Sequence, residues 1–193
     1  MKLVFATHNQ NKFKEVQTLM PGHVELLSLN DIGCHEDIPE TADTIDGNAI
    51  LKAEYVNRHY GYNCFADDTG LEVSSLNGAP GVFSARYAGP AKSAQANMKK
   101  LLEDMKDIED RSARFKTAIA LSLRGNQNLF LGICEGTITQ EPRGEKGFGY
   151  DPVFQPIGLQ ETFAEMSLSQ KSEIGHRGKA MRQLLQYLSL NNS

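Results

Sequence analysis

The sequence predicts an α/β fold, and three observations support this prediction. The chain opens with an expected strand, helix and second strand, an order typical of α/β proteins. Two long strand candidates, residues 113–123 and 129–139, predict a hairpin at the centre of the sheet. The 193 residues are 40% hydrophobic, which is enough for a substantial core. Residues 1–193 are expected to form a single domain, undivided or split into two lobes.

The composition excludes several classes of protein. The formal net charge of −4 argues against general nucleic-acid binding. The three cysteines lie far apart without the paired spacing of a metal site, which fits reduced thiols in a cytoplasmic protein. The first apolar run is too short for a signal sequence, and no apolar run is long enough to span a membrane. We therefore expect a cytoplasmic protein without nucleic-acid or membrane partners.

The first polar loop, residues 7–12, joins an expected strand at residues 3–6 to a helix. The free N–H groups and the dipole at a helix start attract anions. Thr7 and Asn9 can donate hydrogen bonds there, and Lys12 adds a positive charge. The loop predicts a phosphate site, with an ordinary helix cap and a surface lysine as the alternative.

A second strand, residues 24–29, precedes an acidic loop and a helix expected over residues 48–60 and ended by Gly61. Lys52 on this helix can reach a phosphate, balance nearby carboxylates or face solvent. Most acidic side chains of the loop are expected to be solvated, although one of them can complete a metal site. These side chains are Glu36, Asp37, Glu40, Asp43 and Asp46.

Two adjacent carboxylates, Asp67 and Asp68, lie between a strand at residues 63–66 and a second apolar run at residues 71–73. We interpret them as a turn at the end of a strand. Mutual repulsion makes it costly to ionise both unless a cation neutralises them, and Mg²⁺ prefers carboxylate oxygens. The pair therefore predicts a magnesium site, with a solvated turn as the alternative.

Glycines and prolines punctuate a loop at residues 76–90, in which Arg86 can pair with a phosphate or form a structural salt bridge. A helix follows from residue 94. Farther along, glycines flank Phe148 and Tyr150, which suits close approach to a nucleobase and stacking on it. The alternative is a glycine loop with one buried aromatic residue.

The last helix is expected to start near three cationic residues, Lys171, His176 and Arg177. A helix start with this charge attracts anions, although a lone His-Arg pair is usually surface decoration. An acidic metal-type segment, separated cationic groups and a glycine-flanked aromatic loop together fit an enzyme that acts on a nucleotide with Mg²⁺.

The motifs occur in an order that resembles the Ham1-like noncanonical purine nucleoside-triphosphate pyrophosphatases, also called inosine triphosphate pyrophosphatases. The resemblance covers nearly the whole chain, and the number of motifs in one order makes it specific. The motifs are Thr-His-Asn-Gln-Asn-Lys at 7–12, Glu-Thr at 40–41, Asn-Ala-Ile-Leu-Lys-Ala at 48–53, Ala-Asp-Asp-Thr-Gly-Leu at 66–71, Gly-Ala-Pro-Gly at 78–81, Ser-Ala-Arg-Tyr at 84–87, Gly-Phe-Gly-Tyr-Asp-Pro at 147–152, and Ser172 with His176 and Arg177.

The resemblance implies an elongated mixed β-sheet flanked by helices, with two lobes and a central active-site cleft. It also implies a homodimer that hydrolyses ITP, dITP and XTP to the monophosphate and pyrophosphate with Mg²⁺. By motif match, Asp68 is the proton acceptor and a metal ligand, and Glu40 is the second metal carboxylate. The implied substrate-binding residues are Thr7, His8, Asn9, Gln10, Asn11, Lys12, Lys52, Thr69, Phe148, Gly149, Tyr150, Asp151, Lys171, His176 and Arg177.

Some positions depart from the family pattern. Gly47 stands where the family often has a glutamate, so Asp46 or Asp67 remains an alternative to Glu40 in the metal shell. Selectivity for a 6-oxo purine requires a hydrogen-bond donor aimed at that oxygen, because an amino group there would face a buried donor. Arg177, His176 or a loop N–H near Phe148 are the candidates. A Maf-like pyrophosphatase for other modified nucleotides and a non-catalytic nucleotide-binding module are the competing functions.

Overall fold

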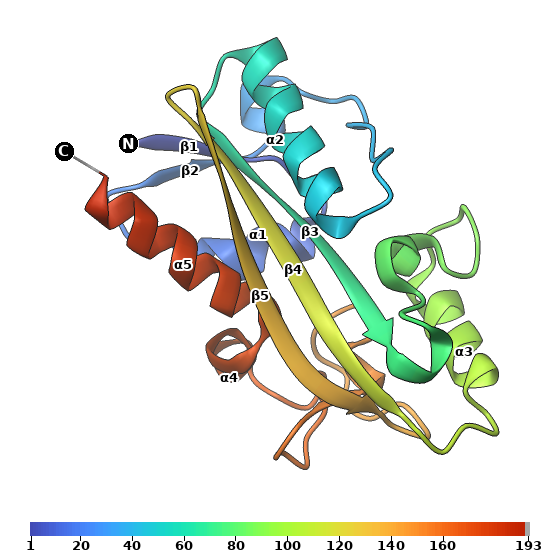
Figure 1. The fold of residues 1–193 in the computed structure, drawn as a ribbon. Coiled ribbons are helices and arrows are strands. Elements are labelled where there is room, and N and C mark those ends of the chain that lie inside the picture. Colours follow the sequence, from blue (N-terminus) through green and yellow to red (C-terminus); the bar gives the residue numbers. More distant parts are fainter. Residues whose placement is uncertain (192–193) are drawn as a thin grey trace. The chain divides into compact units, whose positions relative to one another are not determined.

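The computed structural model describes residues 1–191, which form a mixed six-stranded sheet with helices packed on it (Figure 1). The strand order is β2-β1-β3-β4-β5-β6. Strand β1 pairs in parallel with β2 and β3, whereas β5 pairs antiparallel with β6. The predicted α/β fold with a mixed sheet and flanking helices is confirmed.

The chain opens with a strand, a helix and a second strand, as the sequence predicted. The strands are β1 (Lys2–Phe5), β2 (Glu25–Leu27), β3 (Cys64–Val73), β4 (Ser112–Leu123), β5 (Asn126–Ile138) and β6 (Phe154–Pro156). The α-helices are α1 (Gln10–Gln17), α2 (Ile45–Tyr60), α3 (Ala94–Asp104), α4 (Leu168–Ile174) and α5 (His176–Leu190). Short 3-10 helices occur at Asn30–Ile32, Ser74–Leu76, Gly81–Arg86 and Asp151–Val153.

The chain divides into two compact units. Unit 1 comprises Met1–Asp68, Thr117–Gly132 and the end of the chain from Arg177, and unit 2 comprises Thr69–Lys116 and Ile133–His176. Strands β3, β4 and β5 each contribute residues to both units. The expectation of one domain over residues 1–193 stays a prediction.

Unit 1 has apolar cores on both faces of its strands, because alternate side chains of a strand point to opposite faces. Leu3 and Phe5 of β1 pack with α1 and α5 in one core. Val4 and Ala6 pack with α2 in the other. Accordingly, Figure 1 shows α2 on one side of these strands and α1 and α5 on the other. Burial on both faces explains why β1 reads as a continuous apolar run rather than an alternating one.

Unit 2 has its own core. Leu71 and Val73 of β3 pack there with Leu101 and Met105 from α3 and its C-terminal end, among other residues. The aromatic rings of Phe115, Phe154 and Phe163 lie within 4.7–5.9 Å of one another by centroid. This core contains Tyr150 as well, which is only 5% exposed. The aromatic loop predicted to bind a base is therefore anchored in the core through one of its two rings.

Two sequence interpretations need correction. The predicted turn at Asp67 and Asp68 is wrong, because β3 runs without interruption from Cys64 to Val73. Helix α2 begins at Ile45, three residues earlier than residue 48, because Thr44 caps it through a hydrogen bond from the Gly47 N–H. The predicted hairpin is confirmed, but its loop is shorter than the predicted residues 124–128: β4 and β5 are neighbours joined by Arg124 and Gly125, both with positive φ.

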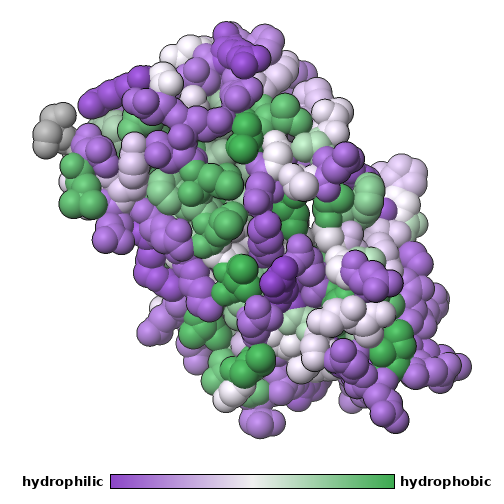
Figure 2. Space-filling model, viewed as in Figure 1, coloured by the Kyte–Doolittle hydropathy of each residue, from purple (hydrophilic) through white to green (hydrophobic). Residues whose placement is uncertain are grey.

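The surface carries scattered apolar side chains among polar ones, as Figure 2 shows for one face. Leu129 and Leu131, two residues apart on β5, are 38% and 39% exposed. No helix within residues 1–191 is long and apolar enough to cross a membrane.

Candidate functional site

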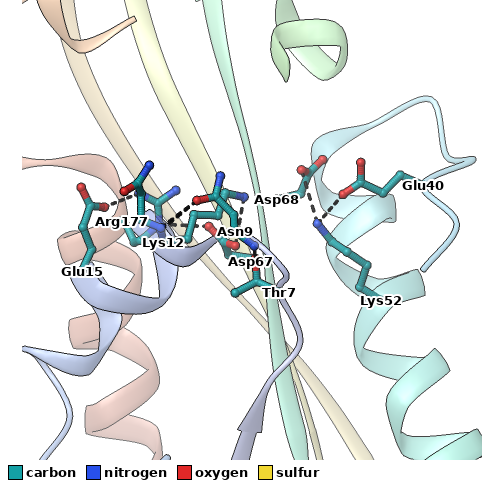
Figure 3. Close-up of polar contacts among 10 residues, drawn as sticks. Thr7, Asn9, Lys12, Glu15, Glu40, Lys52, Asp67, Asp68 and Arg177 are labelled. Carbon is teal, nitrogen blue, oxygen red and sulfur yellow. Dashed lines mark hydrogen bonds and ion pairs between the residues drawn. The ribbon is translucent and has the colours of Figure 1, made fainter. Parts of the chain in front are cut away.

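Asp67 and Asp68 are consecutive residues of strand β3, so their side chains point to opposite faces of the sheet. Figure 3 shows the Asp67 side chain among those of Lys12 and Arg177, and the Asp68 side chain beside Lys52. Asp67 is fully buried and Asp68 is 9% exposed. The two carboxylates that the sequence places together therefore belong to two different groups of residues, both within unit 1.

The first group surrounds Asp67 with positive charge. Its Oδ1 lies 3.0 Å from Lys12 Nζ, and its Oδ2 accepts a hydrogen bond of 3.0 Å from Arg177 Nε. Arg177 also donates to the carboxylate of Glu15 on α1. Burial opposes ionisation of Asp67, but Lys12 and Arg177 outweigh it, so the pKa of Asp67 is lowered from its usual value. Asp67 is thus an ionised anchor for two cationic side chains.

The second group joins Asp68 and Glu40 through one ammonium. Lys52 Nζ lies 2.7 Å from Glu40 Oε1 and 3.6 Å from Asp68 Oδ1. Burial raises the pKa of Asp68, with repulsion from Glu40 and Asp67 adding to this and attraction by Lys52 and Lys12 opposing it. Lys52 is buried, not solvent-facing, and its carboxylate partners raise its pKa despite burial. This arrangement brings together the residues predicted for metal binding and catalysis.

The predicted phosphate loop contains a formed helix cap. Asn9 Oδ1 accepts hydrogen bonds from the N–H groups of Asn11 and Lys12, at 3.0 and 3.2 Å. The hydroxyl of Thr7 accepts from the N–H of Asn9 at 3.2 Å. His8, Asn9, Gln10 and Asn11 are exposed, whereas the side chain of Lys12 is only 14% exposed. The alternative interpretation, an ordinary helix cap, is right for Asn9. It is wrong for Lys12, whose side chain is mostly buried.

Unit 2 brings together three of the predicted substrate-binding residues. Asp151 Oδ2 accepts hydrogen bonds from Lys171 Nζ at 2.6 Å and from the Phe148 N–H at 2.8 Å. Lys171 Nζ also lies 4.8 Å from the centre of the Phe148 ring. Gly147 has φ +72°, and a Cβ there would lie 2.0 Å from Asp151 Oδ2. Glycine is therefore required for this loop to close on Asp151.

The other predicted substrate-binding residues of unit 2 are buried or half-buried. His176 is 3% exposed, and its ring stacks on Phe115 with centroids 4.6 Å apart. The Tyr150 hydroxyl donates to the Ser84 carbonyl oxygen at 2.9 Å, so this ring is the buried aromatic of the alternative reading. Thr69 and Gly149 are half-buried. Lys171 lies inside α4, a helix that the sequence reading missed.

Sequence reasoning also missed two carboxylates of unit 1. Glu15 pairs with Arg177 and is 7% exposed, although its place three residues after Lys12 on α1 marks it as a neighbour on the same helix face. Glu36 is exposed, as expected of a solvated charge, but its carboxylate also accepts hydrogen bonds from Tyr55 and Tyr60 of α2. No sequence signal indicates the Glu36 contacts, since the partners lie on a separate element.

Comparison with known proteins gives close matches over nearly the whole chain. A protein of Christiangramia forsetii named dITP/XTP pyrophosphatase is 67% identical over 189 residues, covering 98% of this chain and 100% of the relative. A protein of Bacillus subtilis with the same name is 44% identical over 189 residues, covering 96% of each chain.

Solved structures agree with these matches. The Ham1 protein of Staphylococcus aureus is 38% identical with a TM-score of 0.89, and the match covers 98% of both chains. The HAM1 protein of Coxiella burnetii is 38% identical with a TM-score of 0.90, again over 98% of both chains. The model of the Ham1 family matches residues 3–187. With a family match of this extent and relatives of this identity, the chain belongs to the Ham1 family.

Proposed function

We propose that this protein hydrolyses noncanonical purine nucleoside triphosphates, namely dITP, XTP and ITP, to the monophosphate and pyrophosphate, and so removes them from the nucleotide pool. Relatives named dITP/XTP pyrophosphatase support the substrate class. The observation that carries the proposal is the arrangement of Asp68 and Glu40 on the ammonium of Lys52. This arrangement offers carboxylates and a cation suited to phosphoryl chemistry.

The carboxylates fit a magnesium ion by their chemistry. Glu40 and Asp68 carry hard oxygen donors and share one positive charge from Lys52, so a further cation would balance the pair. Within residues 1–191, no group of three His, Cys, Asp or Glu side chains suits a metal. Mg²⁺ takes one or two carboxylates in phosphate-binding sites and fills its remaining positions with water and phosphate oxygens. We propose Glu40 and Asp68 as its ligands, and the ion would supply charge neutralisation at the phosphates.

Asp68 is our proposed proton acceptor. A water molecule attacks the α-phosphorus, the bond to the bridging oxygen breaks, and pyrophosphate leaves. The proton of that water passes to the Asp68 carboxylate. The position of Asp68 supports this role, since its carboxylate lies 3.6 Å from Lys52 Nζ and a carboxylate within hydrogen-bond reach of the attacking water can accept its proton. Lys52, held by Glu40, keeps positive charge next to the reacting phosphates.

The remaining predicted residues have two proposed tasks. In unit 1, Lys12 and the loop from Thr7 supply positive charge and hydrogen-bond donors for phosphates, with Asp67 fixing the ammonium of Lys12. In unit 2, Phe148 offers a ring for stacking on the base, while Asp151 fixes Lys171. Arg177, His176 and a loop N–H near Phe148 stay our candidates for the donor that reads a 6-oxo group.

The test is a substrate panel with separate assays of pyrophosphate and orthophosphate. The protein is incubated with Mg²⁺ and dITP, XTP, ITP, ATP, GTP or methylated and modified pyrimidine nucleotides. We expect pyrophosphate from the first three and little from ATP or GTP. Turnover of the modified pyrimidine nucleotides alone would indicate the Maf-like activity. Orthophosphate alone would indicate attack at the γ-phosphorus, and binding without any product would indicate a non-catalytic module.

We further propose a cytoplasmic homodimer. None of Cys34, Cys64 and Cys134 forms a disulfide, which fits a reducing compartment. Leu129 and Leu131 stand on the same face of β5 and are each more than one-third exposed, which suits burial against a second copy.

A further inference from the structure

The segment that carries Glu40, residues 36–42, has no helix or strand of its own. The carboxylate of Glu40 is nevertheless placed 2.7 Å from Lys52 Nζ on α2 (Figure 3). The backbone of a segment without secondary structure needs contacts elsewhere to fix it. Contacts at both ends hold residues 36–42, which we call the Glu40 segment, against α2.

Glu36 holds the first end of the Glu40 segment. Its Oε1 accepts hydrogen bonds from the hydroxyls of Tyr55 at 2.9 Å and Tyr60 at 2.7 Å, both on α2. The Tyr60 hydroxyl, the backbone of Glu36 and the Tyr55 hydroxyl lower the pKa of Glu36 to about 2, so the carboxylate is ionised and both bonds are charge-assisted. The Glu36 carbonyl oxygen also lies 3.0 Å from His8 Nε2 in the predicted phosphate loop.

Other contacts hold the far end and the middle. The Ala42 N–H donates to Asn48 Oδ1 on α2 at 2.9 Å. A Cβ on Gly47 would lie 2.7 Å from Ala42 Cβ, so this glycine lets the segment approach the helix. Ile38 packs against the core that α2 shares with β1. Glu40 thus lies between two attachments to the helix that also carries Lys52.

We propose that Glu36 is a positioning residue for the metal-binding carboxylate: by accepting hydrogen bonds from Tyr55 and Tyr60, it holds the Glu40 segment on α2 and thereby places Glu40 beside Lys52 and Asp68. This inference rests on the proposed function for its metal. Its geometric part stands independently, because the contacts lie within unit 1 and involve no ligand.

Three variants test the proposal. Glu36→Ala removes the acceptor, and the double change Tyr55→Phe with Tyr60→Phe removes both donors. Glu36→Gln keeps an amide oxygen that can accept from the hydroxyls and is the conservative rescue. Tyr62→Phe is the matched control, since it removes a tyrosine hydroxyl just beyond α2 from an exposed side chain.

Two measurements are made on each folded protein. Amide hydrogen exchange over residues 37–42, without metal or nucleotide, reports how firmly the segment is held. We expect exchange about tenfold faster in Glu36→Ala and in the double tyrosine variant, but unchanged in Tyr62→Phe. Titration with Mg²⁺ by calorimetry should show binding weakened about threefold to tenfold in the same two variants and largely restored in Glu36→Gln.

The outcomes separate this inference from the proposed function. Unchanged exchange in both disruptive variants would overturn the inference, because Ile38 and Asn48 would then hold the segment by themselves. Faster exchange with unchanged Mg²⁺ affinity would also overturn it, since Glu40 would not depend on Glu36. Conversely, absence of pyrophosphate release from the wild-type protein would reject the proposed function, while the exchange and Mg²⁺ measurements would still decide the role of Glu36.

Discussion

At the scale of the residue, Asp67 and Asp68 show how one step along a strand changes the chemistry of a carboxyl group. Asp67 lies against Lys12 and Arg177, which lower its pKa despite burial. Asp68 forms an ion pair with Lys52 at the longer distance of 3.6 Å, and burial raises its pKa. The better charge compensation makes Asp67 a structural anion and leaves Asp68 able to accept a proton.

We predict that Asp68→Asn abolishes most turnover while nucleotide binding persists. The amide keeps the shape of the carboxyl group but cannot accept the proton, and loss of a general base typically costs about 10²–10⁴-fold in rate. Pyrophosphate release and calorimetric binding of dITP measure the two effects. Retained turnover would remove Asp68 from the mechanism, and Asp68→Glu serves as the charge-preserving comparison.

We predict that Arg177→Ala is unstable as well as less active. The change leaves the buried carboxylates of Asp67 and Glu15 short of a partner, and breaking a buried pair costs about 3–5 kcal/mol. Urea unfolding measures the loss, with the exposed Gln186→Ala on the same helix as the control. At urea concentrations where the variant is still folded, its rate of hydrolysis should fall further for ITP than for ATP. An equal loss on both nucleotides would show that Arg177 does not read the 6-oxo group.

At the scale of the element, the N-terminal end of α2 depends on the absence of a side chain at Gly47. A glycine inside a helix usually costs about 0.5–1 kcal/mol relative to alanine. Here a Cβ would meet Ala42 Cβ at 2.7 Å and Thr44 Oγ1 at 2.9 Å. At this position we therefore expect alanine, rather than glycine, to be the destabilising residue. The packing of the Glu40 segment against α2 therefore favours glycine at this position.

We therefore predict that Gly47→Ala lowers the free energy of unfolding by about 1–3 kcal/mol, the usual range for overpacking. Gly22→Ala is the matched control, because a Cβ there would have no atom within 4 Å and should leave stability nearly unchanged. Urea unfolding of the two variants makes the comparison. Equal stability of both would mean that residue 42 yields easily to the added methyl group.

At the scale of the whole molecule, ion pairs within unit 1 link stability to pH. The folded-state pKa of Asp67 lies below its ordinary value of 3.8. Its contribution to stability is therefore complete above that ordinary value and is lost as the pH falls through the lower folded-state value. We predict that the free energy of unfolding declines on acidification below about pH 4.

Urea unfolding between pH 6 and pH 2 measures this decline. Asp67→Asn, although less stable at neutral pH, should show a flatter profile over the same range because it has no proton to bind at this position. A profile as steep as that of the wild-type protein would assign the decline to other carboxylates, such as Glu36 with its pKa of about 2.

Assembly belongs to the same scale. We predict that light scattering of the purified protein gives twice the mass of one 21.3 kDa chain. If the apolar residues of β5 form the contact, Leu129→Lys with Leu131→Lys should shift the mass toward that of a single chain. A single-chain mass for the wild-type protein would reject the homodimer.

The sequence by itself determined the α/β class, most element positions, the presence of a hairpin after residue 123, and the residues that resemble the family motifs. These follow from local rules, since apolar periodicity, turn residues and motif spacing are properties of neighbouring positions. The paired carboxylates at Asp67 and Asp68 were visible in the same way. Their interpretation as a turn was wrong, because two adjacent polar residues indicate a turn locally, whereas the apolar residues on either side belong to one continuous strand.

Only the tertiary structure decided which charges neutralise one another. Lys12 pairs with Asp67 across 55 positions of sequence, and Arg177 does so across 110. No periodicity connects residues so far apart, because such contacts arise only when separate elements pack on one sheet. The same reason hid the bonds from Tyr55 and Tyr60 to Glu36 and the burial of Lys52. Local pattern specified the elements, and long-range packing gave each carboxylate its partner and hence its chemistry.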